Sequence, residues 1–382
     1  MSLKLKKETS FLEELGVKYF EKLEQKSTAH KKIVLEDIPS DKVLEAISNV
    51  IVRNATIIAF LIGAIVTIPL VLFEVAYYEK LSLYQFYLQY GFYAFLSLII
   101  ELILLYLLTL HSIYALVHLI GQYPQDKDEL PIVYRIDRIL IRSALELEEP
   151  ILEFMGINPQ KNISKSTMFL SAILYKSKVI LSSFLAKKIL KAIIPRASAR
   201  SIIIPFVGVL IVAFWDAYVI NRSIKDAKLR LFGYYFSKYL IDTILLQKNS
   251  NKEFLIDLEG AVRAIASIMV LSKSNHPNNL LLLVRLNNYL KDDIKEADSL
   301  EAYKKYLQKL PAKKQHYLKL ISTISAILDG VITKEEKEGL KEIYQEDSKY
   351  YFDLLYKMQK LLKQGHIHQL AELVKKEFEK EK

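Results

Sequence analysis

Long apolar runs in the first third of the chain contrast with charged, periodic segments in the last third. Residues 55–73 contain no charged residue, and 86–120 contain one formally charged residue, Glu101. As helices these runs are about 28 and about 52 Å long, against a hydrocarbon core of about 30 Å. The pattern predicts a transmembrane helical hairpin over 55–122, whose second helix projects beyond the bilayer.

The preceding segment, 1–54, is predicted to form amphipathic helices. Its apolar residues recur every three or four positions, which indicates a helix lying on another surface; they are Phe11, Leu12, Leu15, Tyr19 and Leu23. Because the first long apolar run begins only at residue 55, we expect no cleavable signal peptide.

The basic residues that flank the apolar runs predict the orientation of the hairpin. The link between the two helices carries Lys80 alone, whereas Arg53 precedes the first helix. Several basic residues follow the second helix, namely Lys127, Arg135, Arg138 and Arg142. By the positive-inside rule the link faces outward and both termini are cytosolic.

Three polar residues within the second apolar run are candidate intramembrane site residues: Glu101, His111 and His118. An ionisable group at membrane depth is costly and is by default a functional hypothesis. One interpretation is a proton or cation relay, in which the two histidines lie about 80–100° around the helix from Glu101. The other is a protonated carboxyl group that is hydrogen-bonded inside a helix pair or an oligomer.

Small residues recur every fourth position of the first apolar run, at Ala55, Ala59, Gly63 and Thr67. Such a face lets another helix approach closely. We therefore expect the hairpin to contact a protein partner or a second copy of the chain.

The region 131–234 carries the positive charge of the protein. Residues 161–230 hold thirteen basic and two acidic residues, and apolar residues interleave with a set of lysines, which are Lys176, Lys178, Lys187, Lys188 and Lys191. This basic amphipathic segment is predicted to lie on an anionic lipid bilayer. Nucleic acid is not an expected partner, because the segment has no nucleic-acid recognition motif.

A third uncharged run, 201–215, has basic residues on both flanks. The positive-inside rule then assigns neither end to the outside. We expect a re-entrant or buried hairpin, bent at Pro205 and Gly208, in preference to a third span.

The remainder, 235–382, has the pattern of amphipathic helices. Two apolar stripes recur at helical spacing, over Leu255, Leu258, Val262, Ile265, Ala266 and Met269 and over Leu318, Ile321, Ile324, Ser325 and Leu328. A loop is expected over 274–279. Thr333 and Glu336 have the spacing of a capping box.

Composition supports an all-α fold: an integral membrane helical hairpin with a cytosolic helical bundle. Eleven glycines and ten prolines in 382 residues are few, so turn-rich β folds are disfavoured. The lack of cysteine excludes disulfides, thiolate metal sites and cysteine nucleophiles. We found no phosphate-binding loop, dinucleotide fingerprint, serine-hydrolase elbow or HExxH motif, so we expect neither an enzyme nor a cofactor.

Two segments resemble known families. Ile193, Ile194, Pro195 and Arg196, followed by Ile204, Pro205 and Gly208 and then Asn221 and Ala227, are similar to the signature of EcsC-type proteins. Residues 327–336, which read ILDGVITKEE, resemble the hallmark of the tellurite-resistance TerB-like domain. The second resemblance implies Asp329 and Glu336 as possible metal contacts, and the alternative is a turn and a helix cap.

Together the hairpin, the EcsC-like segment and the TerB-like domain resemble a bacterial membrane-protein family with that layout. The resemblance implies a protein of the bacterial inner membrane. We expect a non-enzymatic adaptor, or an envelope-stress-associated module, that binds a protein partner. The alternative is a small transporter or channel subunit that uses Glu101.

Overall fold

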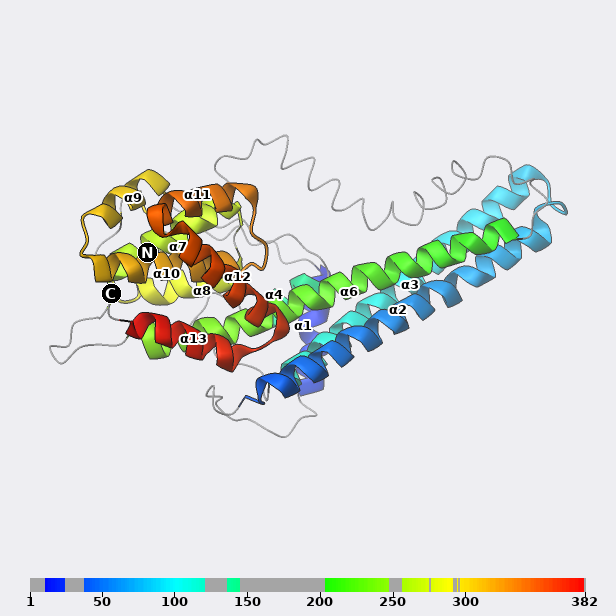
Figure 1. Cartoon of the computed structure of the whole chain (residues 1–382). Coiled ribbons are helices and arrows are strands. Elements are labelled where there is room, and N and C mark those ends of the chain that lie inside the picture. Colours follow the sequence, from blue (N-terminus) through cyan, green and yellow to red (C-terminus); the bar gives the residue numbers. More distant parts are fainter. Residues whose placement is uncertain are drawn as a thin grey trace.

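Long helices dominate the computed structural model, which describes residues 11–24, 38–120, 136–144, 203–246, 256–274, 276–290, 294 and 296–380. The regular elements in these ranges are all helical. Three long helices form an elongated bundle, and shorter helices form a domain at one end of it (Figure 1). The expected all-α class is confirmed.

The bundle consists of α2 (Asp41–Tyr77), α3 (Leu83–Leu119) and α6 (Ile203–Leu240). A short turn, 78–82, joins α2 to α3, and the hydroxyl of Ser82 caps α3 by accepting a hydrogen bond from the backbone N–H of Gln85. All three helices are long and apolar enough to cross a membrane. The predicted hairpin is therefore present, with a third helix packed against it.

α6 differs from the bent insertion expected over 201–220. It runs without a break from Ile203, past Pro205 and Gly208. Pro205 is the third residue of the helix, where a missing N–H removes no intrahelical hydrogen bond. The boundary expected between 234 and 235 also falls inside this helix, because α6 continues into the C-terminal domain.

The end of α3 near the domain projects beyond the apolar part of the bundle, as its length predicted. There it packs against α1 (Phe11–Glu24) and α4 (Ile136–Ala144). A buried carboxylate, Glu13, joins these two helices by accepting hydrogen bonds from Arg138 and Arg142. Of the expected stripe, Tyr19 packs against the core and Leu15 is exposed, while Val17 and Phe20 outside the stripe are buried.

The C-terminal domain surrounds the second half of α6 and the π-helical turn Ile241–Leu245 that follows it. Its helices are α7 (Leu258–Ser272), α8 (Pro277–Asn287), α9 (Leu300–Gln308), α10 (Ala312–Ile327), α11 (Lys334–Tyr344), α12 (Ser348–Gln364) and α13 (Ile367–Glu379). A 3₁₀ turn, Gln345–Asp347, links α11 to α12. Every residue from 318 to 327 is buried, so α10 is the central helix.

Both apolar stripes of the domain are buried wherever the structure describes them. α7 carries the first stripe and packs on α10, which carries most of the second. The loop expected over 274–279 is shorter than predicted, because α8 already begins at Pro277. A proline at the first helical position has no hydrogen bond to lose and is pre-set in φ for a helix.

Candidate functional site

The small-residue face of α2 contacts α6 of the same chain. Ala55, Ala59, Gly63 and Thr67 are all buried. A Cβ atom built on Gly63 would lie 2.9 Å from the Cα atom of Ala213 and would also clash with the Asp216 carboxylate. The face expected to meet a partner or second copy is therefore occupied by α6, and Gly63 permits a close approach of the two helices.

Glu101 of α3 meets Asp216 of α6 in the interior of the bundle. The two carboxyl groups lie within reach of a shared side-chain hydrogen bond. Both residues are buried, with exposed fractions of 9% and 5%. The Oδ2 atom of Asp216 faces Gly63, and among the described residues it has no hydrogen-bond partner.

The carboxyl pair lies inside the apolar belt of the bundle. Ile57, Ile65 and Leu72 on α2 are exposed, as are residues on the other two helices, among them Phe92, Ile103, Phe206, Leu210 and Phe214. Ile57 to Val75 covers about 27 Å along α2, close to the thickness of a hydrocarbon core. Gly63 is about 9 Å from the domain-side edge of this belt.

Hydrogen bonds between helices hold the bundle on either side of the carboxyl pair. The hydroxyl of Ser97 on α3 donates to the carbonyl oxygen of Val66 on α2 at 2.9 Å. The amide of Asn221 on α6 donates to the hydroxyl of Thr56 on α2 at 2.9 Å. Such contacts contribute about 0.6 kcal/mol each on average in membranes.

His111 and His118 do not join Glu101 in one site. Both side chains are exposed on α3, and the ring of His118 packs against Tyr114 with a centroid distance of 4.4 Å. The histidines lie on turns of α3 that are nearer the domain than Glu101. The relay of these three residues expected from the sequence is therefore not assembled, and Asp216 takes the place of the histidines as the partner of Glu101.

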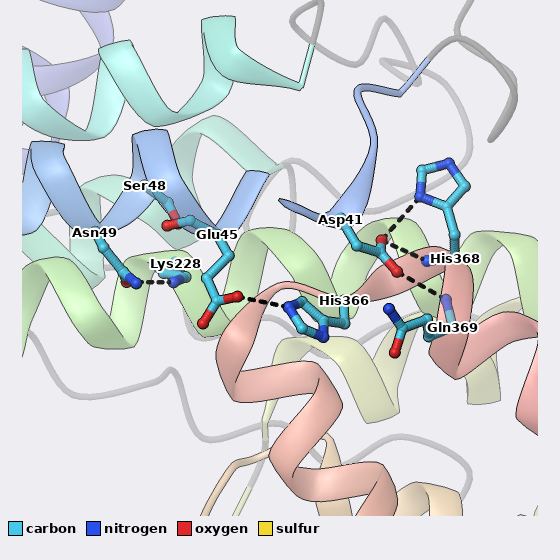
Figure 2. Close-up of polar contacts among 8 residues, drawn as sticks. All are labelled: Asp41, Glu45, Ser48, Asn49, Lys228, His366, His368 and Gln369. Carbon is cyan, nitrogen blue, oxygen red and sulfur yellow. Dashed lines mark hydrogen bonds and ion pairs between the residues drawn. The ribbon is translucent and has the colours of Figure 1, made fainter. Parts of the chain in front are cut away.

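A second polar cluster joins the start of α2 to the C-terminal domain (Figure 2). The Asp41 carboxylate accepts hydrogen bonds from the backbone N–H groups of His368 and Gln369, both at 3.0 Å. These are the second and third residues of α13, whose unpaired N–H groups usually need a cap. Asp41 therefore caps α13 from another helix, and it also lies in the first turn of α2.

Further contacts extend this junction, which we call the clamp (Asp41, Glu45, His366 and His368). The Glu45 carboxylate lies 2.7 Å from Nε2 of His366, and Asp41 lies 2.9 Å from Nδ1 of His368. Next to the clamp, the buried ammonium group of Lys228 on α6 donates to the side-chain oxygen of Asn49 on α2 at 3.1 Å. The bundle and the domain are thus joined by side-chain contacts as well as by α6.

Asp329 and Glu336, the candidate metal contacts, occupy a turn and a helix cap. The backbone N–H of Val331 donates to the Asp329 carboxylate at 3.1 Å. Thr333 and Glu336 form the predicted capping box, with reciprocal hydrogen bonds of 2.8 and 3.1 Å. Among the described residues there is no group of three or more His, Asp or Glu side chains that could hold a metal ion.

Burial and the nearby Glu336 carboxyl raise the pKa of Asp329 to about 8. Burial also raises the pKa of Glu336, and the hydrogen bonds that its carboxylate accepts from the backbone N–H and the hydroxyl of Thr333 oppose that shift. The two acids are therefore close enough to influence each other's charge, although their hydrogen bonds are those of a turn and a cap.

The lysines expected at the membrane surface, Lys176, Lys178, Lys187, Lys188 and Lys191, lie outside the described residues. Their predicted contact with anionic lipid stays a prediction.

Sequence reasoning missed two features. Asp216 follows the third uncharged run directly, and a single acid next to such a run is itself a signal at membrane depth. No pattern in the sequence links His366 and His368 to the start of α2. The clamp joins residues more than three hundred positions apart.

Comparison with known proteins leaves the site to be interpreted from its own geometry. No family model, curated protein or solved structure matches this chain. The EcsC-like and TerB-like resemblances therefore stay predictions.

Proposed function

We propose that this protein is a non-enzymatic membrane adaptor that holds its C-terminal helical domain in a fixed orientation at the cytosolic face of the membrane, where the domain binds a protein partner. The observation that carries the proposal is the continuity of α6. One helix of 38 residues packs in the membrane bundle with its first half and in the core of the domain with its second.

The clamp supports a fixed orientation. A domain that only needed to stay near a membrane could be attached by a flexible linker. Here the Asp41 carboxylate caps α13, and Glu45 pairs with His366. A partner that bound this domain would therefore meet a surface whose direction relative to the membrane is set by the bundle.

The orientation can be measured by pulsed electron resonance between two spin labels. The chain has no natural cysteine, so Lys80→Cys in the α2–α3 turn and Lys337→Cys at an exposed position of α11 give one defined pair. In nanodiscs we expect a narrow distance distribution, which broadens in Asp41→Asn/Glu45→Gln. The control Glu346→Gln/Asp353→Asn changes two exposed acids of the domain outside the clamp. A broad distribution in the unmodified clamp would contradict a fixed orientation.

Partner binding needs its own test. Affinity purification of the full chain from detergent-solubilised membranes should recover a defined protein set, and that recovery should fall in Asp41→Asn/Glu45→Gln but not in the control. Recovery of no protein above an unrelated membrane-protein control would contradict an adaptor role.

A second candidate function is a small transporter or channel subunit, which the buried Glu101–Asp216 pair favours. Intramembrane acids commonly mark ion or proton pathways. Proteoliposomes containing the protein would then pass protons or monovalent cations, as read by a pH-sensitive or ion-sensitive dye. The flux should be lost in Glu101→Gln and retained in Glu79→Gln, an acid at the exposed end of the bundle. Equal leakage from empty vesicles would count against this function.

A further inference from the structure

We propose that Glu101 and Asp216 form a proton-binding site within the membrane bundle, in which one shared proton links α3 to α6. This proposal deepens the second candidate function by naming the proton as the ligand of the carboxyl pair. It holds equally for a protein that transports no ions. It rests on the placement of the two acids and of the groups around them.

The contact between the two acids requires a hydrogen atom. An ionised carboxylate only accepts hydrogen bonds, so a hydrogen bond between two carboxyl groups needs one of them to carry a proton. Asp216 and Glu101 are in such contact. Two carboxyl groups in contact at a buried site cannot both be ionised without a large cost in free energy.

The described parts of the three bundle helices carry no positive charge at the level of the pair. Apart from tyrosines, residues 55–73 of α2 contain no titratable residue, 86–110 of α3 contain only Glu101, and 203–221 of α6 contain only Asp216. In many proteins a buried carboxylate is neutralised by Arg or Lys. Among the described residues at this depth, only a proton is left to remove one of the two negative charges.

The Oδ2 atom of Asp216 supports a proton that binds reversibly. This atom is buried and, among the described residues, accepts no hydrogen bond. It faces Gly63, where the lack of a side chain lets the carboxylate approach the α2 backbone. A purely structural acid pair would be expected to have both oxygens satisfied, because an unsatisfied buried acceptor costs about 1–3 kcal/mol.

Proton loss would then change the bundle. Two negative charges in a medium of low dielectric repel, and α3 and α6 would separate at this level. Because α6 continues into the C-terminal domain, the protonation state of the pair would reach the cytosolic side through one helix.

Infrared spectroscopy of the full chain in lipid nanodiscs tests the site, because a protonated carboxyl group has a carbonyl band separate from that of a carboxylate. The Asp329 carboxyl, whose pKa lies at about 8, would add to this band at neutral pH. All spectra are therefore compared in an Asp329→Asn background. We expect a protonated-carboxyl band that is lost in Glu101→Gln/Asp216→Asn and retained in Glu74→Gln/Glu79→Gln.

The single variant Asp216→Asn serves if the double variant fails to fold, as judged by size-exclusion chromatography in detergent. The Asn amide can donate to an ionised Glu101, so the band should disappear there too. If neither variant folds, ¹³C labelling of aspartate and then of glutamate carboxyls should move the band without altering the pair. A band that no variant or label assigns to these two residues would overturn the proposal.

Sodium titration separates a proton from a metal cation. The band should be unchanged when sodium replaces choline at constant pH. A band that falls with sodium would overturn the proton assignment in favour of a cation. Absence of ion flux in proteoliposomes alongside an intact band would reject the transporter and leave the proton site standing.

Discussion

The membrane bundle and the C-terminal domain are built on the same helix, α6, but their interiors are opposite in kind. Inside the bundle, α6 meets small residues and a carboxyl group, at Ala59, Gly63 and Glu101, while large apolar side chains face outward. Inside the domain, α6 places large apolar side chains at the centre, among them Phe232 and Phe236.

The difference follows from the solvent on each side. In water, burial of apolar surface drives packing and gives about 25 cal/mol per Å². In lipid, an apolar side chain gains little by leaving the hydrocarbon, so close backbone contact and hydrogen bonds hold helices together. One continuous helix therefore follows two sets of packing rules, and the change occurs near Asn221 and Lys228, where polar contacts to α2 begin.

The largest expected effect comes from a cavity in the domain. Ile324 on α10 is fully buried, with 0% exposure, so Ile324→Ala should cost about 2–5 kcal/mol of stability. Its counterpart Ile65→Ala, at 65% exposure on the lipid-facing side of α2, should cost less than about 0.5 kcal/mol. Hydrogen exchange followed by mass spectrometry in detergent measures both, at the α10 amides for Ile324→Ala and at the α2 amides for Ile65→Ala. Equal losses would mean that the two surfaces do not face different solvents.

A matched pair of glycines tests the bundle by overpacking. Gly63→Leu would force a side chain into Ala213 and Asp216, and we expect a loss of about 1–3 kcal/mol. Gly91→Leu on α3 adds the same side chain where no atom lies within 4 Å, so little change is expected. Fluorescence of Trp215, the single tryptophan of the chain, follows thermal unfolding of the bundle. A similar shift for both variants would contradict the close α2–α6 contact.

The pH dependence of the domain should have two opposing limbs. Burial and then the Arg230 charge lower the pKa of His276 to about 3, against a weaker opposing effect of Asp226. The unfolded chain binds this proton more readily, so stability falls as the pH drops from about 6.5 towards 3. Asp329, whose pKa is raised, instead holds a proton when folded, so its contribution falls as the pH rises from about 4 to 8.

Substitutions assign the two limbs. Asp329→Asn should flatten the decline in stability between pH about 6.5 and 8, where Asp329 titrates and His276 is already neutral in both states. His276→Gln should flatten the decline below pH 4. Melting of the full chain in detergent, followed by near-ultraviolet circular dichroism of the domain tyrosines, reports both. Unchanged profiles in the two variants would place the titrating groups elsewhere.

The smallest expected effect is at the capping box. Glu336→Gln keeps an acceptor for the Thr333 N–H, so the loss should be a few tenths up to about 1 kcal/mol. If Asp329 and Glu336 bound a divalent cation, calcium or magnesium would raise the melting temperature of the wild type but not of the variant. We expect only a small cation effect in either chain. A wild-type rise of several degrees that the variant lacks would make this turn a cation site.

The sequence alone determined several of the helices and, for α2, α7 and α10, the side that is buried. The uncharged run of α2, the stripes of α7 and α10, and the Thr333–Glu336 capping box could all be predicted, because each depends on residues a few positions apart. The cost of a charge in hydrocarbon likewise identified Glu101 as a residue in need of a partner. These are properties of a local segment and its solvent.

Only the tertiary structure decided which helices meet and in what register. The small face of α2 predicted a close neighbour, but any helix could fill it, and α6 does. Asp216 became the partner of Glu101 because α6 packs antiparallel to α2, with Asp216 opposite Gly63 and Lys228 opposite Asn49. The periodicity of a helix indicates which of its sides is buried. It carries no information on which other helix packs against that side, or in what register. For the same physical reason the cap that Asp41 provides to α13 could not be predicted from the sequence.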